Sequence, residues 1–286
     1  MNFPQFWAKA EFKSFACWGW SNASLAEAQA AARANAKKTS ARCEANEMVK
    51  RHYGYGDDRP LREPVLREFK DPNGAMLAVI TRNYYGCQVL NTAQIMFIDV
   101  DLPEAPRGPS GLAKLFKGLF GGAKSSAPPA KPDPAQEGLL ARVRQVASNQ
   151  AGWGWRIYRT RAGLRLLATH QFFDPVQSAS HPLFDDLGAD PLYRRLCKAQ
   201  KCFRARLTPK PWRCNVGQPP CAWPWADTEK EQQFKKWESG YINASRSFAT
   251  CELVDTIGNT QMDAAIAPIV AVHDELTRVD SKLPLA

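Results

Sequence analysis

Two aspartates stand two residues apart at the end of an apolar run, in the sequence IMFIDVDLP at residues 95–103. Alternate side chains of a strand share a face, so Asp99 and Asp101 are expected to project together, with Val100 on the other side. Carboxylates without compensation are strongly unfavourable in an apolar setting. Mg²⁺ or Mn²⁺ would neutralise them through oxygen ligands and would serve phosphoryl transfer. A turn-capping pair or a salt bridge also accounts for them.

Basic residues form two sets farther along the chain. The first lies in YRTRAGLRLL, around one expected hairpin, and consists of Arg159, Arg161 and Arg165. The second lies in CFRARLTPKPWRC beside a tryptophan suited to base stacking, and consists of Arg204, Arg206, Lys210 and Arg213. Guanidinium groups bind phosphate through paired hydrogen bonds, so both sets predict contact with a nucleotide or nucleic acid. His170, after a strand-like run, is a further candidate for phosphate or metal. Surface charges beside packed tryptophans are the alternative.

Composition restricts the class of protein. The chain has 286 residues, of which 44% are hydrophobic and 23% charged, as in globular proteins. The net charge of +10 favours a polyanionic partner, although a solvated basic surface gives the same value. No run of about 18 apolar residues indicates a transmembrane segment. The first residues, MNFPQFWAKAEFK, lack the apolar core of a secretory signal, so a cytoplasmic location is expected.

The eight cysteines include no C-x-x-C pair. Four of them cluster with irregular gaps, at Cys197, Cys202, Cys214 and Cys221. Reduced structural thiols are therefore expected rather than a zinc site.

Local signals predict the elements that position these residues. Ser24 and Glu27 form a capping box that opens a helix over 24–38. The run DPNG at 71–74 marks a turn between two strands, and the strand that ends at Asp101 is expected to be the third of that sheet. A turn at Ala162–Gly163 joins two further strands. Helices are predicted at 135–149, from Asp190, at 228–240 and at 259–280. This mixture predicts an α/β or α+β fold.

Composition also divides the chain. Residues 102–134 are dense in Pro, Gly, Ala, Ser and Lys, which predicts a flexible insertion. Residues 1–101 and 135–286 are then the N-terminal and C-terminal parts of one domain. Within the insertion, 111–121 has apolar residues at helical spacing, which fits docking to a protein partner or a membrane surface, or packing on the same protein.

The motifs MFIDVDLP and TRAGLRLLATH, in this order, resemble the archaeo-eukaryotic primase superfamily, and within it the polymerase domain of bacterial DNA ligase D. The resemblance covers roughly residues 75–260. It implies an α+β fold, with a mixed or antiparallel sheet flanked by helices: an RRM-like catalytic core and an N-terminal αβ unit.

The resemblance also implies roles. Asp99 and Asp101 would be catalytic metal ligands, and Asp255 in CELVDTIG would be the third carboxylate, with Glu252 and Asp263 as the next candidates. The phosphate contact of the second motif falls on Arg165 or His170, depending on the alignment, and Lys210 and Arg213 would hold the triphosphate. The implied activity is Mg²⁺- or Mn²⁺-dependent nucleotidyl transfer from a nucleoside triphosphate on a nucleic acid. A non-catalytic nucleic-acid or nucleotide-binding protein of the same fold is the alternative.

Overall fold

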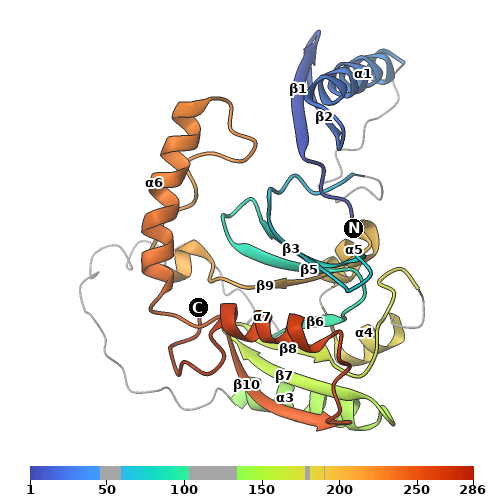
Figure 1. Ribbon diagram of the computed structural model, residues 1–286, viewed down its shortest axis with the longest axis vertical. Coiled ribbons are helices and arrows are strands. Elements are labelled where there is room, and N and C mark those ends of the chain that lie inside the picture. The colour runs from blue at the N-terminus through green and yellow to red at the C-terminus, as the bar shows by residue number, and fades with distance from the viewer. Residues whose placement is uncertain (46–58, 103–133, 178–180, 190) are drawn as a thin grey trace, which may run out of the picture.

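The computed structural model describes residues 1–45, 59–102, 134–177, 181–189 and 191–286. The segment at 111–121 lies outside the described residues, as does all of the insertion at 102–134 except its two end residues. The described part is α+β, as predicted, with three antiparallel sheets and flanking helices (Figure 1). No described helix is both long and apolar enough to cross a membrane. The finer likeness to a primase-polymerase stays a prediction.

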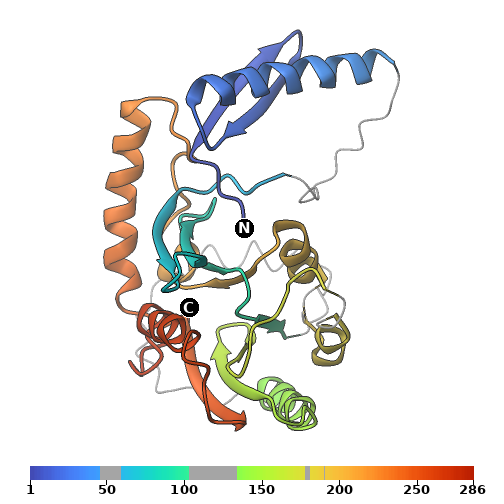
Figure 2. The ribbon, with the colours of Figure 1, turned by 45° about the vertical axis from the view of Figure 1, so that its right-hand side comes forward.

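A hairpin and one long helix form a small N-terminal unit that stands apart from the other sheets (Figures 1 and 2). Strands β1 (Phe6–Phe12) and β2 (Phe15–Ser21) pair, and α1 (Leu25–Glu44) packs on them. The Ser24 side chain accepts a hydrogen bond from the Glu27 backbone N–H at 3.2 Å, which confirms the predicted N-cap. The Glu27 side chain accepts from the Ser21 hydroxyl instead of the Ser24 N–H, so the reciprocal bond of the capping box is absent. The unit has a small apolar core of its own.

The second sheet has the strand order β3-β4-β5-β9. Its strands are β3 (Val65–Lys70), β4 (Met76–Arg82), β5 (Gln88–Thr92) and β9 (Phe203–Arg206). The predicted turn between the first two is confirmed, because the Asp71 side chain accepts hydrogen bonds from backbone N–H groups within that turn.

The third sheet has the order β10-β7-β8-β6. Its strands are β6 (Phe97–Asp101), β7 (Gly154–Thr160), β8 (Gly163–Ala168) and β10 (Cys251–Gly258). The β7–β8 hairpin turns at the predicted position. The expectation that Asp101 ends the third strand of the preceding sheet is wrong. The free edge of β5 is taken by β9, and β6 pairs with β8 instead.

Two helices cover opposite faces of this third sheet. Helix α7 (Ala267–Thr277) lies on one face, where Arg156 of β7 forms an ion pair with Asp274. Helix α3 (Pro134–Ser148) lies on the other, where Arg159 of β7 pairs with Glu137. These are called the α7 face and the α3 face. In Figure 1 both helices flank the strands at the bottom of the view.

The remaining helices lie around the two four-stranded sheets (Figure 1). They are α4 (His181–Leu187), α5 (Pro191–Gln200), the short 3₁₀ helix η2 (Pro211–Cys214) and α6 (Thr228–Ser245). The closing helix α7 is shorter than predicted, because a proline in its first turn begins it. One apolar core runs through both four-stranded sheets.

Candidate functional site

A guanidinium compensates the first of the two aspartates. Asp99 of β6 lies opposite Arg165 of β8 on the α7 face. Arg165 donates from Nε to Asp99 Oδ1 at 2.7 Å and from Nη2 to Oδ2 at 3.0 Å. Paired hydrogen bonds of this kind are among the strongest ion pairs in proteins. A salt bridge, one of the alternatives considered above, therefore compensates the Asp99 charge.

Arg165 is held in turn by β9 and α7. Its side chain is buried, and its Nη1 donates to the backbone oxygen of Arg206 at 2.9 Å and lies 3.4 Å from His273 Nε2. An arginine N–H can only donate, so His273 accepts there and donates from Nδ1 to Asp274. Burial lowers the pKa of Arg165, but the Asp99 carboxylate more than offsets this, and the guanidinium stays charged. Arg165 is therefore a structural counter-ion rather than a free phosphate ligand.

The predicted third carboxylate does not join this site. Asp255 lies opposite Ile157, whose side chain is on the α3 face, and pairs there with Arg144 at 2.6 Å. The physical reason is a β-bulge between Leu253 and Asp255. Leu253 lies opposite a residue of the α7 face, and regular alternation would have sent Asp255 to that face too, but one extra residue reverses the side. The prediction for Asp255 as a partner of the β6 aspartates is wrong in this structure.

The other acidic candidates are also engaged elsewhere. Glu252 pairs with Arg159, and the Asp263 side chain accepts a hydrogen bond from the backbone of Ala265 near the start of α7. Within the described residues, no group of three or more His, Cys, Asp and Glu side chains is placed to hold a metal ion. The side chains present therefore do not form the three-carboxylate metal centre that the resemblance implies.

Four of the predicted phosphate ligands do come together. Arg161 lies in the β7–β8 turn, Arg206 ends β9, Lys210 immediately precedes η2, and Arg213 lies within it. They lie close enough that each of Lys210 and Arg213 responds to the charge of its neighbours and of Asp101. These four residues are called the basic cluster. They lie where the second sheet meets β6.

The positive charges of the basic cluster repel one another. Burial lowers the pKa of Lys210, and the Arg206 and Arg213 charges lower it further, while Asp101 acts in the opposite direction. The pKa of Arg213 is lowered by burial and by Arg206 and Arg161, again against Asp101. One carboxylate therefore does not balance four cations, and an anion placed here would stabilise the charged forms.

The other predicted phosphate ligands lie outside the basic cluster, although Arg204 lines the cavity described next. Arg159 is on the α3 face between two glutamates, and Arg204 is buried with Glu63 at 2.9 and 3.0 Å. His170 lies beyond the far end of β8, where its Nδ1 accepts from the Gly154 N–H and its ring packs on Trp153. These three side chains are engaged by protein groups in this structure, and they do not belong to the basic cluster.

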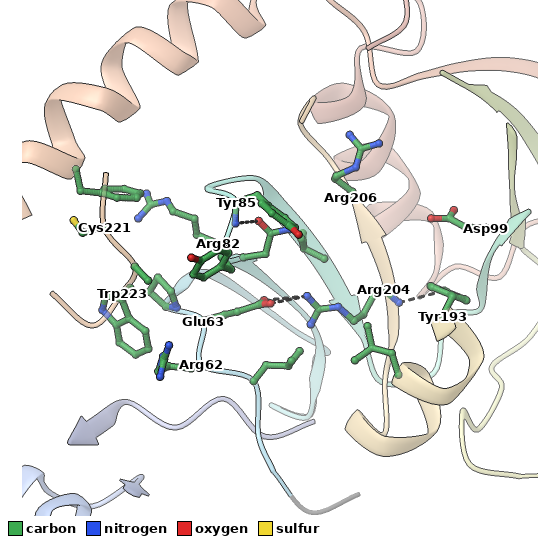
Figure 3. A pocket seen from close by; sticks show the side chains of 18 residues that line it. Arg62, Glu63, Arg82, Tyr85, Asp99, Tyr193, Arg204, Arg206, Cys221 and Trp223 are labelled. Atoms are coloured by element: carbon green, nitrogen blue, oxygen red, sulfur yellow. Dashed lines mark hydrogen bonds and ion pairs between the residues drawn. The ribbon is translucent and has the colours of Figure 1, made fainter. Parts of the chain in front are cut away.

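A cavity of about 390 Å³ opens beside the basic cluster, and Asp99 and Arg206 lie on its wall (Figure 3). Tyr84, Tyr85 and Arg82 line it too and were not predicted. The sequence NYYG, between two strands, could have predicted an exposed tyrosine, because two adjacent residues in a tight turn cannot both enter a core. The sequence predicted only part of the cavity lining.

The clustered cysteines are free thiols. Burial raises the pKa of Cys197 to about 12 and that of Cys202 to about 11. Both are therefore uncharged at neutral pH, as structural cysteines are.

Comparison of the chain with protein-family models, curated proteins and solved structures gave no match. The resemblance to primase-polymerases rests on the short motifs alone.

Proposed function

We propose that this protein binds the phosphate backbone of a nucleic acid at the basic cluster, without a metal centre of its own. The observation that carries the proposal is the meeting of four cations, drawn from the β7–β8 turn and from the stretch from β9 to η2, with Asp101 beside Lys210 and Arg213. Bringing like charges together costs free energy, which a phosphate placed among them would offset. This is the non-catalytic alternative named in the sequence analysis.

The state of the aspartates supports the same proposal. Asp99 is bound by Arg165, and Asp255 faces α3 and pairs with Arg144, so these two carboxylates have separate counter-ions on opposite faces of the sheet. Asp99 then fixes the junction between β6 and β8, while the cations that surround Asp101 do the binding. The basic cluster would then recognise phosphate through charge and hydrogen bonds.

Binding of a fluorescently labelled oligonucleotide, followed by anisotropy, tests the proposal. The double variant Lys210→Ala/Arg213→Ala should bind about ten-fold more weakly than the parent at moderate salt, because phosphate contacts are lost. The matched control is Lys235→Ala/Lys236→Ala on α6, which removes the same charge from an exposed surface. Equal losses in both double variants, or no binding by the parent, would rule out the cluster as the site.

A second candidate function is the nucleotidyl transfer implied by the resemblance. One observation favours it: the Asp99 side chain is 33% exposed and lies on the wall of the cavity, on the same face as Asp101. Asp99 and Asp101 would hold Mg²⁺ or Mn²⁺ there, and a nucleoside triphosphate would occupy the cavity. Incorporation of labelled nucleotides on primed and unprimed templates, abolished by Asp101→Asn, would support this candidate.

A further inference from the structure

Three exposed aromatic rings gather at one place on the surface. Tyr84, Tyr85 and Trp212 are 66%, 40% and 45% exposed, and the other large hydrophobic side chains exposed among the described residues are aliphatic. The rings of Tyr84 and Tyr85 are 5.7 Å apart, and those of Tyr85 and Trp212 are 5.2 Å apart. These three residues are called the aromatic strip. Exposed aromatic surface that is contiguous, rather than scattered, is typical of a binding site.

A tight turn holds the tyrosine half of the strip. The Asn83 side-chain oxygen accepts hydrogen bonds from the backbone N–H groups of Tyr85 and Cys87, both at 3.0 Å. Gly86 adopts a φ of +80°, and the ring of Trp237 occupies the space where a side chain on Gly86 would lie. The turn is therefore fixed from inside the molecule, and its rings are presented without a large loss of conformational freedom on binding.

The aromatic strip adjoins the basic cluster. Lys210 Nζ lies 5.5 Å from the centre of the Trp212 ring, and Trp212 and Arg213 are neighbours in η2. Tyr84 and Tyr85 line the same cavity as Arg206. Flat rings beside unbalanced cations match a ligand that has both aromatic faces and negative charges.

We propose that the aromatic strip stacks the unpaired bases of a single-stranded nucleic acid whose phosphates lie on the basic cluster. This inference rests on the function proposed above and adds the class of substrate. In a duplex the base faces are already stacked on one another, so they are not available to stack on the rings of the aromatic strip. Stacking on a protein ring tolerates any base, so selectivity for strand state, and not for sequence, is expected.

Anisotropy with one labelled single strand and its duplex tests this inference. The parent should prefer the single strand by about ten-fold. Trp212→Ala and Tyr84→Ala should each weaken single-strand binding several-fold and leave duplex binding unchanged, and Trp212→Phe should restore most of it. Ile242→Ala, which trims an exposed side chain of α6, is the control. Melting temperatures of all variants establish that they are folded.

The outcomes separate the inference from the function on which it rests. Salt-dependent binding of both ligands with equal affinity, insensitive to Trp212→Ala, would overturn the aromatic strip and leave phosphate binding intact. No binding of either ligand would overturn both. A concentration-dependent dimer that Trp212→Ala abolishes, without effect on oligonucleotide affinity, would assign the strip to self-association and overturn the inference.

Discussion

Asp99 and Asp255 lie on opposite faces of the same sheet. Asp99 is held on the α7 face by Arg165, and Asp255 is held on the α3 face by Arg144. Neither carboxylate can approach the other without breaking the β7–β8–β10 pairing between them. The sheet itself therefore separates the acidic residues that a metal-dependent transferase would have to combine.

The Asp99–Arg165 pair should contribute strongly to folding. Arg165→Met leaves the Asp99 carboxylate, which is 33% exposed, without its counter-ion, and we expect a loss of about 1–3 kcal/mol in the free energy of unfolding. Urea denaturation measures it. The control is Arg194→Met, which breaks an exposed pair with Asp185 and should cost about 0.5 kcal/mol. Similar losses in the two variants would contradict the role given to Arg165.

Acid should destabilise the protein through His273. Its ring is buried, and burial lowers the pKa of His273 below the value of about 6.5 in the unfolded chain. Below pH 6.5 the unfolded chain therefore binds a proton that the folded protein does not, and stability falls as pH falls. For one such group the slope approaches about 1.4 kcal/mol per pH unit. His170, whose pKa burial also lowers, adds a contribution of the same sign.

Urea denaturation between pH 7 and pH 5 checks this. His273→Gln should reduce the pH dependence of the free energy of unfolding. His170→Gln measures the separate contribution of His170. Asp274, whose pKa is also lowered, affects stability only below about pH 4, outside this interval. An unchanged slope in His273→Gln would show that the folded protein accepts a proton at this ring.

The N-terminal unit depends on a glycine contact. A Cβ on Gly19 would collide with the α1 backbone at Ala28 and Ala32. Gly19→Ala should therefore separate the hairpin from the helix and cost about 1–3 kcal/mol. Gly138→Ala is the matched control, because a Cβ there meets nothing and α3 should gain about 0.5–1 kcal/mol. Equal melting temperatures for the two variants would show that α1 and the hairpin are not tightly packed.

A manganese titration distinguishes the two candidate functions. The melting temperature of the parent in millimolar Mn²⁺ should rise no more than that of Asp101→Asn, because Asp99 is already neutralised by Arg165. A rise in the parent that disappears in Asp101→Asn would establish a metal site at β6. That result would favour nucleotidyl transfer over simple binding.

Local features of the fold could be read from the sequence. The Ser24 cap, the Asp71 turn and the Ala162–Gly163 hairpin each depend on neighbouring residues, and all three are confirmed. The pairing of remote strands could not be predicted, because β9 and β5 meet through tertiary packing and carry no matching local signal. The strand that ends at Asp101 was therefore assigned to the wrong sheet.

The candidate site was predicted in part for the same reason. Arg161, Arg206, Lys210 and Arg213 were named from their residue types and do converge. The β-bulge that places Asp255 on the α3 face could not be predicted from the residues of CELVDTIG. Burial of Arg165 depends on α7, which contributes His273 from far along the chain. Residue type indicated which basic side chains could contact phosphate, and only tertiary structure separated the four that converge from those held in ion pairs.

The salt dependence of single-strand affinity tests the basic cluster most directly. Each phosphate contact releases counter-ions, so single alanine variants of Arg161, Arg206, Lys210 and Arg213 should each lower the slope of log K against log salt by about 0.7. Lys235→Ala on α6 should leave that slope unchanged. Slopes equal to that of the parent in all four cluster variants would contradict phosphate binding at this site.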